Sequence, residues 1–171
     1  MFKKLRGMEA KHEAEMLHRA AAYCSTAERC IHDVRKKMAS AGLSPESEER
    51  IIARLIEEKF IDEARFCRSF VNDKLRFNEW GRIKTSYELR RKGIAQSVID
   101  EALGQIDEDD YQRILTDLLR RKKRTVRSVS DTDLFVKLCR FAANKGYEQS
   151  LVIQCVRELC QGGAFDDDDL E

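Results

Sequence analysis

The chain has 171 residues, of which 37% are charged, 42% are hydrophobic and one is proline, a composition typical of a mostly helical soluble protein. The formal net charge is +1, and because residues 166–171 carry five acids, the rest of the chain has 32 bases against 26 acids. This modest excess excludes a protein that holds nucleic acid by charge alone, and no apolar run reaches the roughly 20 residues that a membrane span needs. A partner made of both protein and nucleic acid fits this charge better than naked duplex DNA does.

Apolar residues recur three and four positions apart along the chain, which predicts an all-α fold. In chain order the clearest runs are Ile52, Leu55 and Ile56; Phe66, Cys67, Phe70, Val71 and Leu75; Ile114, Leu115, Leu118 and Leu119; and Leu151, Val152, Cys155, Val156 and Leu159. Residues that favour helix N-termini mark the expected helix starts, which are Ser25 or Thr26, Ser44 with Pro45 in the first turn, Asp62, Asp131 and Ser150.

A helix followed by a glycine, one apolar residue and a second helix is predicted three times. The glycines are Gly42, Gly93 and Gly146, in the segments KMASAGL, ELRRKGI and FAANKGY. Glycine suits the left-handed residue that closes a helix, and a nearly constant spacing indicates one unit stacked on copies of itself. We therefore predict three tandem three-helix repeats, each resembling a helix-turn-helix, at residues 9–61, 62–107 and 108–161, in an elongated, curved array. Residues 1–8 form an N-terminal segment, and the acidic tail 162–171 is expected to be disordered.

The six cysteines form no CxxC pair and lie in apolar helical patterns, so we expect small buried hydrophobic residues in a reducing, cytoplasmic environment. Residues 1–7 also lack the following apolar stretch that a signal peptide requires. A zinc site at Cys24, Cys30 and His32 has no fourth ligand at the usual spacing. The chain shows no HExxH motif and no glycine-rich loop that would hold phosphate. The sequence predicts neither an enzyme nor a cofactor.

Residues 60–94 carry the most specific motif, FIDEARFCRSFVNDKLRFNEWGRIKTSYELRRKGI. This stretch resembles the signature of the RecX family, bacterial regulators of the RecA recombinase. The matching positions are Phe60, Ile61, Asp62, Glu63, Arg65, Phe66, Ser69, Phe70, Val71, Asp73, Gly81, Arg82, Lys84, Glu88, Leu89, Lys92, Gly93 and Ile94. The chain departs from the pattern at Cys67, where alanine is usual, and at Trp80, Thr85 and Tyr87.

Most of the signature residues are expected to build the fold. Asp62 is placed to cap a helix, and Phe60, Ile61, Phe66 and Phe70 are expected to pack the joint between the first two repeats. Arg65 is the one signature residue in this part of the motif that we expect to contact a partner. The motif thus identifies a family more than it marks a binding site.

The resemblance implies a protein that binds RecA and the filament that RecA forms on single-stranded DNA. It implies negative modulation of filament growth, ATPase and strand exchange in recombination and SOS repair, with weak direct DNA binding and no membrane. The candidate contact residues are the bases Arg65, Arg82, Lys84, Arg90, Arg91, Lys92, Arg120, Lys123, Arg124 and Arg127. On a continuous helix Arg120, Arg124 and Arg127 would share one face. Trp80 and Phe77 either cover the core or stack on a base.

Two other functions fit the pattern. A helix-turn-helix with glycine in the turn is also typical of transcriptional regulators that read duplex DNA. A helical-repeat scaffold for an unrelated protein is the second alternative, although the surface charges of the repeats differ more than such arrays require. The sequence leaves open whether the protein caps a filament or lies along its groove, and we expect a monomer.

Overall fold

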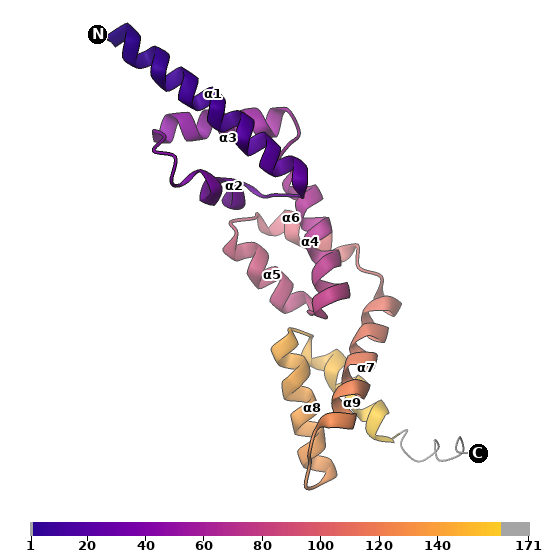
Figure 1. Ribbon diagram of the computed structural model, residues 1–171. Helices are drawn as coiled ribbons and strands as arrows, with labels where there is room; N and C mark the ends of the chain where they lie inside the picture. The colour runs from indigo at the N-terminus through magenta and orange to yellow at the C-terminus, as the bar shows by residue number, and fades with distance from the viewer. Residues whose placement is uncertain (1, 162–171) are drawn as a thin grey trace, which may run out of the picture. The chain divides into compact units, whose positions relative to one another are not determined.

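The computed structural model describes residues 2–161, and over this range the regular secondary structure consists of nine helices joined by loops, with no strand (Figure 1). The helices are α1 (Phe2–Thr26), α2 (Ile31–Met38), α3 (Pro45–Glu57), α4 (Glu63–Asn78), α5 (Arg82–Arg91), α6 (Gln96–Gly104), α7 (Glu108–Thr125), α8 (Asp131–Lys145) and α9 (Gln149–Gln161). The predicted all-α class is therefore confirmed. The acidic tail lies outside the described residues.

Two compact units make up the described chain. The first consists of residues up to 69 together with residues 90–99, and the second consists of residues 70–89 together with residues from 100 onward. The boundary passes within α4, α5 and α6, so the middle of the chain contributes to both units. The division into three sequence repeats stays a prediction.

In the first unit, α1, α2 and α3 pack against one another, as Figure 1 shows. Their contact is made by apolar side chains that recur at helical spacing. The core consists of Met16, Ala20, Cys24, Val34, Met38, Ile51, Ile52, Leu55 and Ile61, with Phe60 packed beside it. Burying each of the larger aliphatic side chains stabilises the unit by about 1.5–3 kcal/mol.

In the second unit, α7, α8 and α9 pack together. Tyr111, Leu115, Leu118 and Leu119 on α7 meet Leu138 and Ala142 on α8 and Val152, Cys155 and Val156 on α9, with Leu75 of α4 at the same core. The rings of Tyr111 and Tyr147 lie 5.1 Å apart, centroid to centroid. This core supports the loop and helix described in the next subsection.

Two of the expected helix starts are confirmed by their capping bonds. The Ser44 hydroxyl accepts a hydrogen bond from the backbone N–H of Ser47, and Pro45 is the first residue of α3. The Asp62 carboxylate accepts from the N–H of Arg65 at 2.9 Å, and this bond lowers the pKa of Asp62. Both side chains satisfy N–H groups that a helix leaves without partners in its first turn.

The other expected starts need correction. Ser25 and Thr26 end α1, because their hydroxyls donate back to carbonyls of the preceding turn, and Cys30 precedes α2 without a side-chain cap. Helix α8 does begin at the expected Asp131, although the capping side chain is that of Ser130, one residue earlier. Ser150 lies inside α9, which begins at Gln149. Short polar side chains favour both ends of helices and turns, so the residue type alone does not distinguish them.

The three repeat glycines adopt the left-handed conformation that their pattern predicts, with φ of +66° at Gly42, +77° at Gly93 and +88° at Gly146. Gly146 closes α8, and its N–H donates to the last turn of that helix. The helix–glycine–helix pattern in the sequence therefore corresponds to real helix ends.

Most of the cysteines are buried as expected, but Cys160 is exposed. Burial raises the pKa of Cys30 and of Cys67 to about 11, so both thiols stay protonated near neutral pH.

Among the described residues, no cluster of three or more His, Cys, Asp or Glu side chains could hold a metal ion. In the same part of the chain, no helix combines the length and the apolar character that crossing a bilayer requires.

Candidate functional site

The loop between α4 and α5 is held by the end of α8, within the second unit. The backbone N–H of Gly81 donates to the carbonyl of Lys145 at 2.9 Å, and the N–H of Ile83 donates to the carbonyl of Gly146 at 3.0 Å. In the other direction, the Lys145 ammonium donates to the carbonyl of Asn78. These bonds satisfy both backbone N–H groups at the start of α5 and backbone carbonyls at the end of α8, groups that have no partner within their own helices.

Glycine is required on both sides of this contact. A Cβ atom on Gly81 would lie 2.2 Å from the carbonyl oxygen of Gly146, and one on Gly146 would lie 2.3 Å from the Cβ of Lys84. Any side chain at either position would push the two backbones apart. The glycine of the sequence signature therefore serves a close backbone approach.

Trp80 lies next to this contact, between two lysines. The Lys84 ammonium is 4.5 Å from the centroid of the indole ring, and the Lys74 ammonium is 4.9 Å from it. Trp80 is half-buried, whereas Phe77 one turn earlier is 79% exposed and covers no core. An indole flanked by two ammonium groups offers a stacking surface and positive charge together, and each cation–π contact contributes about 0.5–1 kcal/mol at an exposed site.

Arg82, in contrast, is tied into the fold. Its guanidinium pairs with Glu108 at 2.5 Å and with Glu148 at 3.4 Å, and it stacks 4.1 Å above the ring of Tyr111. The Tyr111 hydroxyl accepts from the N–H of Arg82 and donates to Glu148 at 2.6 Å. Burial and the bond to Glu148 raise the pKa of Tyr111 well above its usual value, so the phenol keeps its proton. This network is a structural cross-link among α5, α7 and the start of α9.

The basic end of α7 contains both paired and unpaired cations. Lys123 donates to the carbonyl of Leu159 near the end of α9, where a cation also suits the helix dipole. Arg120 pairs with Asp117 on its own helix, and Arg121 pairs with Glu79 in the loop before Trp80. The guanidinium of Arg124 has no partner among the residues described.

Arg127 lies outside the helical face that the spacing predicts. α7 ends at Thr125, and Val126 has extended backbone angles. Arg120 and Arg124 therefore share a helix face, but Arg127 belongs to the loop between α7 and α8. Its side chain has no partner within residues 9–160, and only its carbonyl is bound, by Lys137.

In the first unit, two of the candidate bases serve the fold. Arg65 pairs with Glu28 at 2.6 Å and donates to the carbonyl of Lys59. Lys92 pairs with Asp33 at 2.6 Å, and both side chains are mostly buried. Arg90 and Arg91 are exposed at the last turn of α5.

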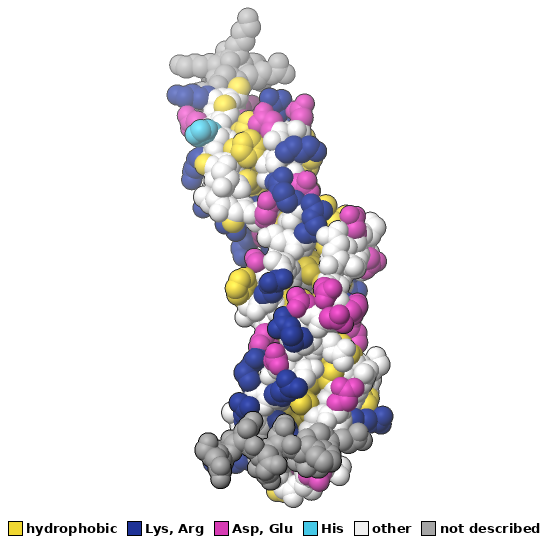
Figure 2. Space-filling model, turned by 90° about the vertical axis from the view of Figure 1, so that its right-hand side faces the viewer, with side chains coloured by type: hydrophobic (Ala, Val, Ile, Leu, Met, Phe, Trp, Pro, Cys, Tyr) yellow, Lys and Arg dark blue, Asp and Glu magenta, His cyan; other side chains and the backbone are white. Residues whose placement is uncertain are grey.

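Contacts thus place eight of the ten predicted site residues in two groups. Arg65, Arg82, Lys92 and Lys123 hold other parts of the chain, whereas Lys84, Arg90, Arg124 and Arg127 have no ion pair within the described range. Sequence reasoning missed Lys74, because its place beside Trp80 depends on the backbone turn after α4. On the face drawn in Figure 2, Lys and Arg side chains alternate with Asp and Glu side chains rather than forming one wide basic area.

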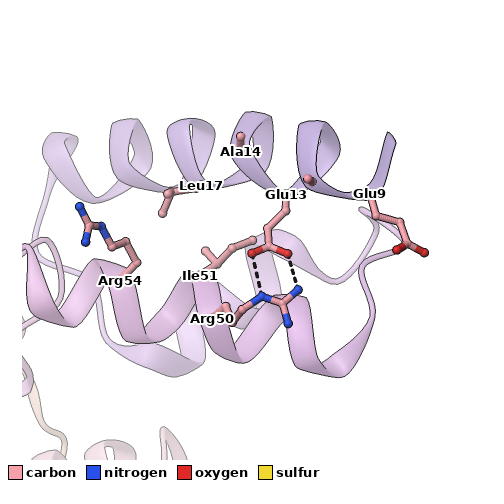
Figure 3. Close-up of a pocket in the computed structure, with 8 residues that line it drawn as sticks. Glu9, Glu13, Ala14, Leu17, Arg50, Ile51 and Arg54 are labelled. Atoms are coloured by element: carbon pink, nitrogen blue, oxygen red, sulfur yellow. Dashed lines mark hydrogen bonds and ion pairs between the residues drawn. The ribbon is translucent and has the colours of Figure 1, made fainter. Parts of the chain in front are cut away.

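A hollow of about 630 Å³ between α1 and α3 is a second candidate site. Figure 3 shows Glu13 on α1 pointing toward Arg50 on α3, where two hydrogen bonds of 3.0 and 2.6 Å join them. The guanidinium lowers the pKa of Glu13, so this carboxylate stays ionised. Arg54 also pairs with Glu57 and Glu58. Both arginines of this hollow therefore pair with carboxylates, and the pair between Glu13 and Arg50 cross-links α1 to α3.

Comparison with known proteins gives the context of these features. Residues 62–103 match the family model described as "RecX, second three-helix domain". The chain is 35% identical over 122 residues to Regulatory protein RecX of Clostridium tetani, covering 70% of this chain and 54% of that protein. It is 29% identical over 143 residues to Regulatory protein RecX of Prosthecochloris aestuarii, covering 84% of this chain and 92% of that protein.

Among solved structures, the fold is similar to that of a regulatory protein RecX, with a TM-score of 0.82 at 24% identity over 92% of this chain and 78% of the other. RecX from Lactobacillus salivarius matches with a TM-score of 0.76 at 19% identity, over 88% of this chain and 97% of the other. The chain spans between half and two thirds of the length of several curated relatives, with 54%, 59% and 63% covered in three of them. Together, the signature from Phe60 to Ile94, the family-model match and the likeness to the curated relatives establish that the chain belongs to the RecX family of regulatory proteins.

Proposed function

We propose that this protein binds RecA and the filament that RecA forms on single-stranded DNA, and that it negatively modulates filament growth, ATPase and strand exchange. It acts as a regulator without catalysing a reaction of its own. Family membership supports the partner, and the modest positive charge supports a target made of both protein and nucleic acid. RecA's ATP hydrolysis falls because the filament changes, without contact between this protein and ATP.

The observation that carries this proposal furthest is the arrangement around Trp80. Lys74 and Lys84 flank a half-buried indole on a loop that the backbone contact between Gly81 and Gly146 holds in place. Single-stranded nucleic acid is commonly bound by an aromatic stacking surface beside cations that follow the backbone. We assign Lys84, Arg124 and Arg127 as phosphate contacts of the second unit, and Arg90 as a further contact.

The remaining candidates take a different role in this proposal. Arg82 and Lys123 stabilise the second unit through their bonds within the chain, and Arg65 and Lys92 do the same in the first unit. Arg120 and Arg91 are exposed and stay candidate contacts. A variant that changes only cations without ion pairs therefore tests binding without disturbing the fold.

The test is a titration of RecA ATPase on single-stranded DNA with this protein. The wild type is compared with a variant carrying Lys84→Glu, Arg124→Glu and Arg127→Glu. A control with Lys11→Glu, Lys36→Glu and Arg157→Glu changes the net charge equally at exposed positions elsewhere. We expect inhibition by the wild type and the control below one protein per RecA, and at least tenfold weaker inhibition by the first variant.

Salt dependence adds a second measurement. Removing one phosphate contact to a single strand makes the slope of log affinity against log salt shallower by about 0.7, so the slope of the first variant should be shallower by about 2. No inhibition by a several-fold excess of wild type would contradict the proposal. Sequence-specific binding to duplex DNA in the absence of RecA would instead favour a transcriptional regulator.

A further inference from the structure

An apolar groove of about 490 Å³ lies in the second unit, among α5, α8 and α9. Ile83 of α5 faces it together with Phe135, Val136 and Ala143 of α8 and Ile153 of α9. None of the phosphate contacts assigned above lines it. The groove is therefore a surface that the proposed DNA contacts do not use.

Large apolar side chains are concentrated here although they are open to water. Ile83 is 55% exposed and Val136 is 46% exposed, and Tyr87, one turn after Ile83 on α5, is 54% exposed. Single exposed apolar residues are ordinary, but two that line one hollow, with Tyr87 on the same helix as one of them, indicate a surface that binds another molecule. Helix α5 thus presents apolar side chains outward while Thr85 and Leu89 face the interior.

The charge of the groove indicates which kind of molecule fits. Arg140 is the one charged residue in the lining, and no acid lines the groove. Within the part of the chain that the structure describes, Arg140 has no hydrogen-bonding or ion-pair partner. A cation beside an apolar hollow complements an apolar side chain with a neighbouring carboxylate. Nucleic acid fits poorly, because one cation among aliphatic residues neither follows a phosphate backbone nor stacks on bases.

We propose that this groove docks an apolar segment of a protein partner that carries a carboxylate next to its apolar side chains. This inference rests on the proposed function: in the filament, that segment belongs to the recombinase polypeptide rather than to the DNA. The second unit then has two separate surfaces. The groove holds protein, and the cations near Trp80 and at the end of α7 hold nucleic acid.

Substitutions at the groove test this division. Val136→Asp places a charge where an apolar partner side chain would lie, and Ile83→Asp does the same on α5. Val129→Asp is the matched control, because Val129 is 94% exposed in the loop before α8 and does not line the groove. Circular dichroism melting confirms that each variant folds, and having two groove variants guards against a failure of either one.

Affinity is measured for RecA filaments and, separately, for a single-stranded oligonucleotide. We expect both groove variants to bind filaments at least tenfold more weakly while binding the oligonucleotide as the wild type does, with Val129→Asp unchanged in both measurements. Unchanged filament binding by the folded groove variants would overturn the inference, and so would an equal loss of oligonucleotide binding. Failure of the wild type itself to bind filaments would refute the proposed function, and the inference with it.

A photo-crosslinker identifies the occupant directly. p-Benzoylphenylalanine replaces Val136, with the same replacement at Val129 as the control, and each protein is irradiated with RecA filaments. A cross-link from position 136 to the RecA polypeptide supports the inference. A cross-link to DNA, to a second copy of this chain or to its own residues 162–171 would overturn it, as would no cross-link while filament binding persists.

Discussion

Gly81 and Gly146 meet backbone to backbone, so closely that a Cβ atom on Gly81 would lie 2.2 Å from the carbonyl oxygen of Gly146. The N–H groups of Gly81 and Ile83 donate to the last two carbonyls at the end of α8. This contact determines where α5 begins. It thereby places Trp80 and Lys84, the residues on which the proposed nucleic-acid surface depends.

Gly146→Ala is expected to lower the free energy of unfolding of the second unit by about 3 kcal/mol, from a left-handed backbone and a steric overlap together. Gly93→Ala is the control, because Gly93 has φ of +77° but open space around its Cα. The control substitution Gly93→Ala should lower the free energy of unfolding by only about 1 kcal/mol. Urea denaturation measures the free energy of unfolding of both variants. Equal decreases would show that the close backbone contact between Gly81 and Gly146 is unimportant for stability.

The ion pair between Asp33 and Lys92 predicts a pH dependence of stability in the first unit. Burial alone would raise the pKa of Asp33, but hydrogen bonds from Lys92 and Cys30 outweigh it, and the pKa is lowered. A carboxylate with a lowered pKa stabilises the fold above its unfolded-state pKa, near 3.9, and this stability is lost as the pH falls through the folded-state pKa.

Asp33→Asn tests this dependence. At pH 7 the substitution should cost about 1–3 kcal/mol, since it removes a charge-assisted hydrogen bond. The difference from wild type should shrink as the pH falls below the unfolded-state pKa near 3.9 and Asp33 becomes protonated. Chemical denaturation at several pH values measures the difference in the free energy of unfolding between the wild type and Asp33→Asn. A difference that does not change with pH would contradict an ionised pair of Asp33 and Lys92.

Arg82→Ala is expected to destabilise the second unit, because it leaves Glu148 without one of its hydrogen-bond donors and removes the stacking on Tyr111. The expected cost is about 2–3 kcal/mol. Arg124→Ala should change stability by less than about 0.5 kcal/mol, since its guanidinium has no partner among the described residues. Thermal melting compares them. If both variants melt like the wild type, the network around Arg82 does not support the fold.

Trp80 is the single tryptophan of the chain, so its fluorescence reports on the proposed contact surface. Stacking of a base on the indole should quench its emission when a single-stranded oligonucleotide is added. Lys84→Ala should weaken the oligonucleotide affinity several-fold, whereas Lys36→Ala, at an exposed position of α2, should not. Unchanged emission at an oligonucleotide concentration that saturates binding would remove Trp80 from the surface.

Local features of the sequence predicted much of the fold. Helical spacing predicted the all-α class, and the pattern of helix, glycine and apolar residue placed left-handed residues at Gly42, Gly93 and Gly146. Ser44 and Asp62 were predicted as caps and confirmed. The helix starts predicted at Ser25 and Ser150 were wrong. A short polar side chain hydrogen-bonds to nearby backbone at either end of a helix and is also tolerated inside one, so its presence does not by itself mark a helix start. Such features depend on residues a few positions apart, which the sequence displays directly.

Which of the basic residues are available to a partner was decided by the tertiary structure alone. Arg82 and Lys84 are equally basic and two positions apart, yet Arg82 pairs with carboxylates 26 and 66 residues away, while Lys84 lies against Trp80. The groove around Val136 likewise brings α5 together with α8 and α9, from which α6 and α7 separate it in the chain. The sequence by itself determined the helices, their left-handed ends and the family. Long-range packing decided which charges are neutralised and which apolar side chains stay open, because both depend on groups that meet only after folding.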